Sequence, residues 1–316
     1  MSKEKIIIIG DGAVGSSFGY ACVIQGIGRE IGIIDMNQDK ADGDAMDLSD
    51  ALAYTSPCHI YGASYSDCKD ADIVVITAGA PQKQGETRLD LVNKNMKIMK
   101  SVIDNLMSSG FDGLILVASN PVDIMTYAAQ KFSGLPKNRV FGSGTSLDSA
   151  RFRKEISLLL NVDARNVHGY IMGEHGDSEF PAWSATNIGG LSIFDWVKTH
   201  PDVDEESLVN IFFNVKNAAY EIIKRKGATY YGIGVALARI TKAILNNEHS
   251  ILPLSVALEG QYGLNDIYIG IPAVVGRDGI LSIIELNLNE SEMNKLIQSA
   301  NMLREVQEAA LACLND

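Results

Sequence analysis

The hydrophobic positions in the first half of the chain fall into two alternating patterns. Short runs that are almost continuously apolar and rich in β-branched residues are typical of strands buried on both faces. These runs lie at residues 6–9, 31–34, 73–77 and 114–118. Longer stretches with helical spacing stand between them, notably at residues 14–25 and 89–107. Strands that alternate with helices in this way predict a doubly wound parallel sheet with helices on both faces.

The pattern changes in the second half. A helical pattern runs through residues 208–226, and two strand-like runs at 267–275 and 280–284 flank a Gly-Arg-Asp-Gly turn. Strands separated by such a turn are typical of a hairpin. The last segment places apolar residues at three- and four-residue steps from Met293 to Ala310, which predicts an amphipathic closing helix. The second half is therefore expected to be of α+β type.

These patterns divide the α/β chain into two predicted domains. We expect the first to cover residues 1–142 and the second residues 143–316, with the boundary near Ser143 and a helix starting around Leu147. No repeat and no low-complexity linker interrupts either part.

Composition and charge exclude several classes of function. The chain has 316 residues, of which 46% are hydrophobic and 21% charged, and its net charge is −12. Such acidity argues against a nucleic-acid partner, because that binding relies on clustered Lys and Arg. The four cysteines lack CxxC spacing and the five histidines are mostly isolated, so we expect no metal. The apolar run near the N-terminus is too short for a signal peptide or a membrane span, which predicts a cytoplasmic protein without membrane contact.

A glycine-rich turn directly follows the first predicted strand. The hexapeptide from Gly10 to Gly15, GDGAVG, fits GxGxxG and opens a helix, which is the context of a Rossmann-type dinucleotide site. Gly10 would permit the tight turn, Gly12 the approach of backbone to a pyrophosphate, and Gly15 the packing of helix on strand. The helix N-terminus would offer free N–H groups to the phosphates.

Asp35 stands at the end of the second predicted strand, 20 positions after Gly15. A carboxylate there accepts hydrogen bonds from ribose hydroxyls and repels a 2′-phosphate. Met36 follows it, where an arginine would favour NADP. The sequence therefore predicts NAD as the cofactor.

Polar residues gather in three further segments. A polar stretch at residues 79–88 and the pair Asn120-Pro121 each follow a predicted strand, at the sheet edge where α/β proteins bind ligands. The third segment pairs Asp148 and Arg151, three apart on one helix face, with the run Gly-Glu-His-Gly-Asp at residues 173–177. Taken singly, an Asp/Arg pair is commonly a surface ion pair and a His-Gly pair a turn.

Four segments together resemble the lactate and malate dehydrogenase family, and the resemblance covers essentially the whole chain. They read ITAGAPQKQGETRLDLV, NPVDIMTY, GSGTSLDSARFR and GEHGDSEFP. The resemblance implies hydride transfer between NADH and a 2-oxo acid, with the first domain holding NAD and the second the substrate. It implies these cofactor-binding residues: Gly10, Gly12, Ala13, Val14, Gly15, Asp35, Ala78, Gly79, Ala118 and Asn120.

The resemblance also implies the catalytic roles. His175 would exchange a proton with the substrate oxygen, oriented by Asp148. Arg151 would bind the substrate carboxylate through two parallel hydrogen bonds, and Arg88 would polarise the carbonyl. Asn120 would donate a hydrogen bond at the reacting centre. By the same resemblance, Thr229 would line the substrate pocket and the bond before Pro121 would be cis.

Gln82 bears on the choice of substrate. Malate-specific relatives carry an arginine at this position, which neutralises the second carboxylate of oxaloacetate. A neutral side chain would leave that carboxylate buried without a partner, at a cost of several kcal/mol. We therefore expect pyruvate as substrate and L-lactate as product. The alternative is a malate dehydrogenase or another 2-hydroxy acid dehydrogenase. The positive charge of the neighbouring Lys83 could partly replace the missing arginine and so favour the malate alternative.

Arg153 and His168 match positions that bind fructose 1,6-bisphosphate across a two-fold subunit interface in some bacterial members. The resemblance implies a homotetramer activated by this effector. The alternative is that Arg153 forms an ordinary interface ion pair and His168 a strand-end contact. An NAD-binding protein without turnover is a further alternative, which the intact set of catalytic residues disfavours.

Overall fold

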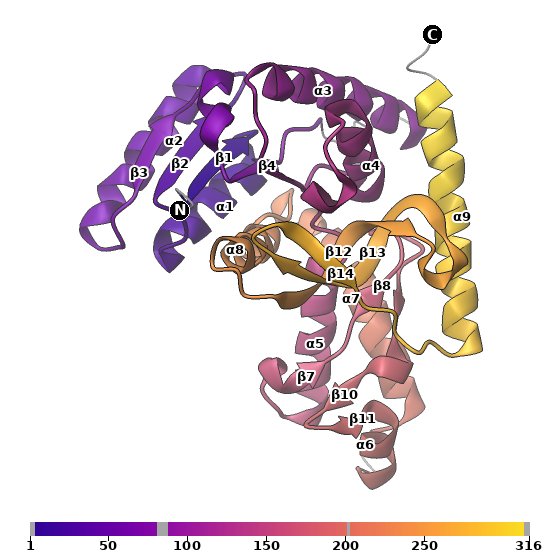
Figure 1. Ribbon diagram of the computed structural model, residues 1–316. Coiled ribbons are helices and arrows are strands. Elements are labelled where there is room, and N and C mark those ends of the chain that lie inside the picture. The colour runs from indigo at the N-terminus through magenta and orange to yellow at the C-terminus, as the bar shows by residue number, and fades with distance from the viewer. Residues whose placement is uncertain (1–3, 81–87, 201–202, 313–316) are drawn as a thin grey trace.

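One mixed sheet runs through both halves of the chain (Figure 1). The structure is a computed structural model that describes residues 4–80, 88–200 and 203–312. The sheet has nine strands in the order β14-β13-β12-β6-β5-β4-β1-β2-β3. Its parallel strands are β1 (Lys5–Ile9), β2 (Glu30–Ile34), β3 (His59–Gly62), β4 (Ile73–Ile76), β5 (Leu114–Val117) and β6 (Val140–Gly142). Its antiparallel strands are β12 (Ser250–Glu259), β13 (Asn265–Gly276) and β14 (Gly279–Ile283).

Helices connect and cover these strands. The first half contains α1 (Ala13–Gln25), α2 (Gln38–Asp50), α3 (Arg88–Ser108) and α4 (Val122–Ser133). The second half contains α5 (Ser146–Leu160), α6 (Ile193–Thr199), α7 (Glu205–Lys226), α8 (Tyr231–Leu245) and α9 (Glu290–Ala312). Helix α1 packs against α8 and α5 against α7, while α9, yellow in Figure 1, reaches back to α3 and α4. The two halves are therefore in extensive contact.

The remaining elements are short. Two small sheets are made by β7 (Val167–His168), β10 (Asn187–Ile188) and β11 (Leu191–Ser192), and by β8 (Ile171–Met172) and β9 (Phe180–Pro181). Turns of 3₁₀ helix lie at Ala51–Ala53, Tyr65–Asp70, Lys137–Arg139, Ala164–Asn166, Trp183–Ala185 and Gln261–Gly263.

The apolar runs form the core, as their pattern predicts. The residues of β1, β4 and β5 are buried, and they pack with the helices into one large hydrophobic cluster that extends into β12 and β13. A second cluster joins α5 to α7 around Phe152, Ile156 and Val215. The four strands, the long helices and the closing hairpin that the sequence predicts are all present.

The sequence pattern did not reveal β3, β6 and β12. Only one residue of β3 is fully buried, because this strand lies at the sheet edge. Strand β6 has only three residues, and β12 carries Pro253 and Ser255 within its apolar run, which weakens a strand signal. Ser255 of β12 pairs with Gly142 of β6, so β12 joins the predicted hairpin, β13 and β14, to the sheet of the first half.

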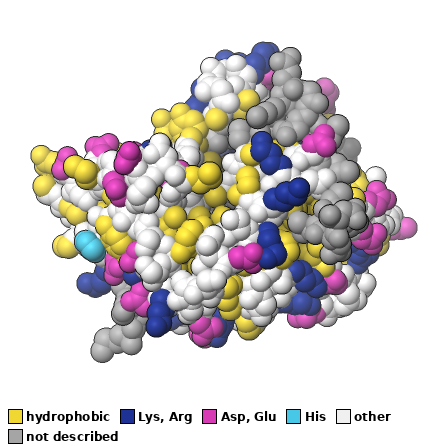
Figure 2. All heavy atoms as spheres, turned by 90° about the horizontal axis from the view of Figure 1, so that it is seen from above, with side chains coloured by type: hydrophobic (Ala, Val, Ile, Leu, Met, Phe, Trp, Pro, Cys, Tyr) yellow, Lys and Arg dark blue, Asp and Glu magenta, His cyan; other side chains and the backbone are white. Residues whose placement is uncertain are grey.

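The surface carries charges of both signs. Acidic and basic side chains are mixed with hydrophobic ones over the face shown in Figure 2. Among the described helices, none is long and apolar enough to cross a bilayer.

Candidate active site

An acid–base pair lies where α5 meets the loop after β8. Asp148, in the first turn of α5, approaches Nδ1 of His175 with Oδ2 at 2.6 Å. Its Oδ1 accepts a hydrogen bond from Nη1 of Arg151 at 3.0 Å, one helical turn further on. The side chains of Asp148 and Arg151 are 4% and 12% exposed, whereas that of His175 is 28% exposed. The imidazole is therefore anchored on one side and accessible on the other.

The environment favours the charged imidazolium. The negative charge of Asp148 is the main reason that the pKa of His175 rises from 6.5 to about 9, against the opposing effect of burial. Burial alone would raise the pKa of Asp148, but the charges and hydrogen bonds of His175 and Arg151 bring it below its ordinary value. A buried carboxylate between two cations stays ionised, which is the arrangement of an oriented general acid.

Asp123 is a further buried carboxyl in this centre, and sequence reasoning missed it. Its Oδ2 accepts a hydrogen bond from the backbone N–H of His175 at 2.8 Å, and its Oδ1 accepts one from Oγ of Ser255 at 2.6 Å. Burial raises its pKa to about 6. An acidic residue two positions after Pro121 in NPVD, at the start of a buried helix, was the available signal.

The glycine-rich turn is closely packed except at one point. Gly10 has a φ of 104°, and a Cβ there would collide with the backbone of Ala78. A Cβ on Gly15 would collide with the carbonyl oxygen of Gly10. Gly12 differs, because a Cβ there would have no neighbour within 4 Å. The chain thus presents bare backbone and open space at Gly12.

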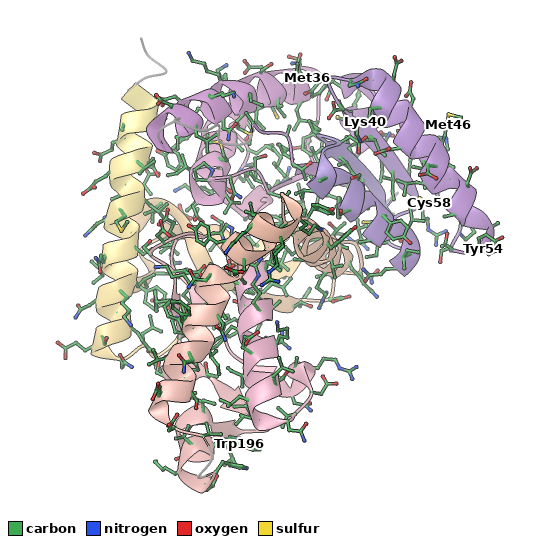
Figure 3. All side chains as sticks on the ribbon, turned by 180° about the vertical axis from the view of Figure 1, so that it is seen from behind. Met36, Lys40, Met46, Tyr54, Cys58 and Trp196 are labelled. Carbon is green, nitrogen blue, oxygen red and sulfur yellow. The ribbon has the colours of Figure 1, made fainter. Side chains whose placement is uncertain are left out.

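Asp35 closes this turn from the end of β2. Its Oδ2 accepts a hydrogen bond from the N–H of Asp11 at 2.7 Å, and its Oδ1 accepts one from the N–H of Asn37 at 2.9 Å. Met36 is fully exposed beside it, and Lys40 near the start of α2 binds the carboxylate of Asp11 at 2.7 Å (Figure 3). The carboxylate of Asp35 is therefore fixed by backbone donors at the carboxyl end of the strand.

The loops after β4 and β5 lie at the same carboxyl end of the parallel strands, and Ala78 adjoins Gly10 of the glycine-rich turn. Ala78 and Gly79 follow β4, and Ala118 follows β5. The carbonyl of Ala78 accepts a hydrogen bond from Ser119 at 2.6 Å. The buried Asn95 of α3, which the sequence did not single out, accepts a hydrogen bond from the N–H of Ala80 at 2.8 Å. Asn95 also donates to the backbone carbonyl of Asn120 at 2.9 Å, so it joins the two loops.

The remaining predicted substrate residues are placed as follows. Asn120 is exposed at the carboxyl end of β5, and its bond to Pro121 is cis, as expected. Thr229 lies half-buried in the connection between α7 and α8. Helix α3 begins at Arg88, but the side chain of Arg88 and the whole of Gln82 lie outside the described residues.

Comparison with known proteins identifies the family. Residues 4–142 match the family model described as lactate/malate dehydrogenase, NAD binding domain. Residues 145–313 match lactate/malate dehydrogenase, alpha/beta C-terminal domain. The chain belongs to the lactate/malate dehydrogenase family. The resemblance inferred from the four sequence segments is confirmed.

Relatives within this family are close along the whole length. An L-lactate dehydrogenase 1 from Enterococcus faecalis is 64% identical over 309 residues, covering 98% of this chain and 94% of that protein. An L-lactate dehydrogenase from Lacticaseibacillus casei is also 64% identical over 309 residues, with 98% and 95% covered. A crystal structure of a lactate dehydrogenase from a Medee basin deep-sea metagenome library superposes with a TM-score of 0.97 at 52% identity, covering 98% of this chain and 99% of that one.

The first half is the family's NAD-binding domain, and its residues fit that cofactor. Ala13 and Val14 begin α1, whose first turn has neither a side-chain cap nor an acidic residue. Its free N–H groups and the open space at Gly12 suit a pyrophosphate. Each carboxylate oxygen of Asp35 accepts one backbone hydrogen bond, which leaves acceptor capacity for ribose hydroxyls.

Arg153 and His168 line one cavity, of about 610 Å³, together with Arg239 from α8. His168 is exposed on β7. Arg153 donates from Nη2 to the carbonyl of Ala164 at 3.2 Å, while its buried Nε has no hydrogen-bond partner. The cavity thus combines two guanidinium groups with an imidazole.

Proposed function

We propose that this chain is an NAD-dependent L-lactate dehydrogenase that interconverts pyruvate and L-lactate, with His175 as proton donor and acceptor. The arrangement of Asp148 between His175 and Arg151 carries this proposal. This arrangement holds a general acid, His175 in the loop after β8, beside a carboxylate-binding guanidinium, Arg151 on α5. The names of the relatives at 64% identity support the same activity.

Each residue has a distinct task in this mechanism. The glycine-rich turn and Asp35 would hold NADH, which would supply the hydride when bound. Arg151 uses the N–H groups not engaged with Asp148 to hold the substrate carboxylate in a parallel pair of hydrogen bonds. His175 donates the proton on its accessible nitrogen to the carbonyl oxygen, and the charge of Asp148 stabilises the imidazolium before transfer. In lactate oxidation the neutral imidazole accepts this proton.

Three further residues complete the proposed substrate site. Arg88 polarises the carbonyl, and its positive charge offsets the negative charge that develops on the oxygen. Asn120 donates a hydrogen bond at the reacting centre, and it is fixed through its backbone by Asn95. Thr229 lines the substrate pocket from the connection between α7 and α8. These roles follow the family resemblance residue by residue.

Gln82 supports pyruvate over oxaloacetate. A neutral side chain gives the second carboxylate of oxaloacetate no partner, and the resulting cost corresponds to roughly 10²–10³ in kcat/KM. Malate dehydrogenase remains the second candidate, because the family includes it.

A direct assay separates these functions. NADH oxidation by the purified chain is measured with pyruvate and with oxaloacetate, and NADH binding is followed by its fluorescence. We expect roughly 10²–10³-fold higher kcat/KM with pyruvate. Comparable values would refute the argument from Gln82, and binding without turnover would refute the enzymatic proposal.

We also propose activation by fructose 1,6-bisphosphate at Arg153 and His168. Two copies related by a two-fold axis would bring two guanidinium and two imidazole groups to one bisphosphate. The shared cavity and the unpaired Nε of Arg153 support an anion there.

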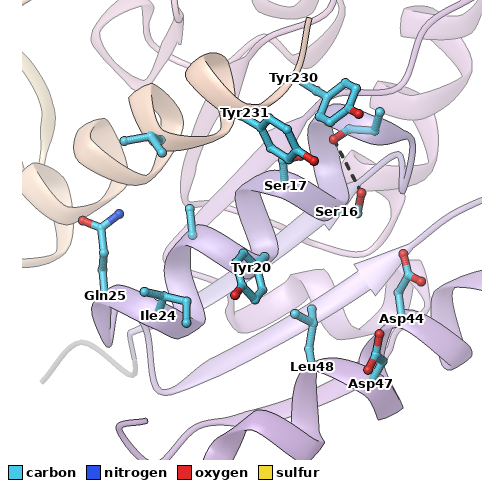
Figure 4. A pocket seen from close by; sticks show the side chains of 13 residues that line it. Ser16, Ser17, Tyr20, Ile24, Gln25, Asp44, Asp47, Leu48, Tyr230 and Tyr231 are labelled. Atoms are coloured by element: carbon cyan, nitrogen blue, oxygen red, sulfur yellow. Dashed lines mark hydrogen bonds between the residues drawn. The ribbon is translucent and has the colours of Figure 1, made fainter. Parts of the chain in front are cut away.

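A homotetramer is proposed from the same family resemblance. Tyr20 and Ile24 of α1 and Tyr231 of α8 are 57%, 55% and 68% exposed and line a groove of about 690 Å³ (Figure 4). Apolar surface of this kind suits a subunit contact.

We propose that residues 1–142 bind NAD and that residues 143–316 bind the substrate and the effector and form subunit contacts. A cytoplasmic location fits the free thiols of Cys22, Cys58 and Cys68.

A further inference from the structure

Glu179 is a buried carboxyl beside the acid–base pair, and the mechanism above gives it no task. It precedes β9 and is 7% exposed. A carboxylate oxygen of Glu179, a ring nitrogen of His175 and an oxygen of Asp148 all lie within 4.8 Å of one another. The imidazole therefore lies close to two carboxyl groups, one hydrogen-bonded to it and one not.

We propose that Glu179 is a positioning residue that sets the protonation state of His175 by placing a second negative charge near the imidazole. The inference rests on the proposed function, in which His175 exchanges a proton with the substrate. At this range in a poorly solvated site, a carboxylate stabilises the imidazolium without touching the substrate. Asp148 orients the ring of His175, and Glu179 adjusts the proton affinity of the imidazole.

The charges around Glu179 come from several elements. Asp148 and Arg151 face it from α5, His175 from its own loop and Lys216 from α7, while Asp123 of α4 acts on His175. Burial, and next the charge of Asp148, raise the pKa of Glu179 to about 8. The charge of Glu179 in turn raises the pKa of His175. The two groups thus titrate in neighbouring pH ranges.

Glu179 also borders a cavity formed with α7 and α9. It lines this cavity, of about 240 Å³, together with Phe212 of α7 and with Lys295 and Gln298 of α9. His175 is not among the residues that line this cavity, so Glu179 borders a space that is separate from the imidazole.

The test is the pH dependence of Glu179→Gln in both reaction directions. Pyruvate reduction needs charged His175, so its kcat/KM falls as the pH rises through the pKa of His175. Removing the charge of Glu179 lowers this pKa, and we expect the fall to begin about one pH unit lower. At pH values above the wild-type pKa of His175, the variant should be about tenfold slower than the wild type. Lactate oxidation needs neutral His175, so its rise should move in the same direction.

A readout independent of turnover accompanies the kinetics. The chain has five histidines, so ¹³C-labelled histidine gives few resonances, and His175→Asn assigns the one that matters. The titration of His175 in Glu179→Gln should move down by the same amount. Glu308→Gln, which removes an exposed charge from α9, serves as the control and should leave both profiles in place.

The outcomes separate the two proposals. Shifts in both the kinetic profile and the resonance support the inference. Rates lowered equally at every pH, with an unmoved resonance, would overturn it and leave Glu179 a packing residue. If the wild type does not turn over pyruvate, the proposed function fails, while the resonance still tests the coupling of Glu179 to His175. If Glu179→Gln does not fold, Glu179→Ala removes the same charge and replaces it in both measurements.

Discussion

Asp148→Asn isolates the charge that acts on His175. The substitution keeps the size of the side chain and leaves an amide oxygen able to accept from Nδ1, now held at 2.6 Å from Asp148. What it removes is the negative charge, the first cause of the rise in the pKa of His175 from 6.5 to about 9. This pKa difference of about 2.5 corresponds to about 3 kcal/mol between the two protonation states, a net figure in which the charge of Asp148 outweighs the opposing effect of burial.

The expected effect on the rate follows from this pKa. At a pH of about 7.5, nearly all His175 is charged in the wild type. If its pKa returns toward 6.5, only about a tenth stays charged in the variant, which gives a loss of about tenfold in pyruvate reduction from protonation alone. Imperfect orientation of the ring adds a further loss at every pH. Lowering the pH to about 5.5 should restore the tenfold loss that comes from protonation, whereas the loss that comes from imperfect orientation should persist.

The assay is kcat/KM for pyruvate, measured by NADH absorbance between pH about 5.5 and about 9.5, with lactate oxidation measured in parallel. Thermal unfolding confirms that both proteins are folded over this range. A variant whose activity falls at the same alkaline pH as that of the wild type would refute the reasoning. So would a deficit that lower pH does not reduce.

Four other substitutions test the cofactor, substrate and effector sites. Gly15→Ala should lower the free energy of unfolding by about 2 kcal/mol or more, because its methyl collides with the carbonyl of Gly10. Gly12→Ala has open space, so it should keep its melting temperature but bind NADH at least about tenfold more weakly. Equal NADH affinities for Gly12→Ala and the wild type would place the pyrophosphate elsewhere. Gln82→Arg should raise kcat/KM for oxaloacetate by about tenfold or more, and no change would mean that selectivity lies outside this position. Arg153→Gln should leave basal pyruvate reduction near that of the wild type and abolish the response to fructose 1,6-bisphosphate at pH about 5.5 and about 7.5. A wild type whose activity does not respond to the bisphosphate at either pH would contradict the effector proposal.

The sequence predicted those features that depend on local patterns. Strands β4 and β5, and β1 after its first residue Lys5, are apolar at every position because helices cover both of their faces. The three-residue spacing of Asp148 and Arg151 places them on one face of α5, where they form an ion pair. In these cases the physical cause lies within a few residues of its effect.

Features made by distant segments could not be predicted in this way. Asp123 accepts hydrogen bonds from residues 52 and 132 positions away, and nothing in its immediate neighbours indicates them. Glu179 looks like any acidic residue after a turn until the fold buries it near Asp148. The pairing of β6 with β12 depends on residues more than a hundred positions apart, in strands with weak local signals.

The junction between β6 and β12 also has a consequence for biosynthesis. Until β12 has been made, β6 is an edge strand with open hydrogen-bonding groups, which invites pairing with other chains. Ser255, which closes this edge opposite Gly142, lies in the last quarter of the 316 residues. The first half of the chain therefore leaves the ribosome with its sheet unfinished and its Asp123 without the Ser255 hydroxyl. Protection of this edge during synthesis, by chaperones or by rapid completion of the chain, becomes part of what the cell must provide to obtain the enzyme.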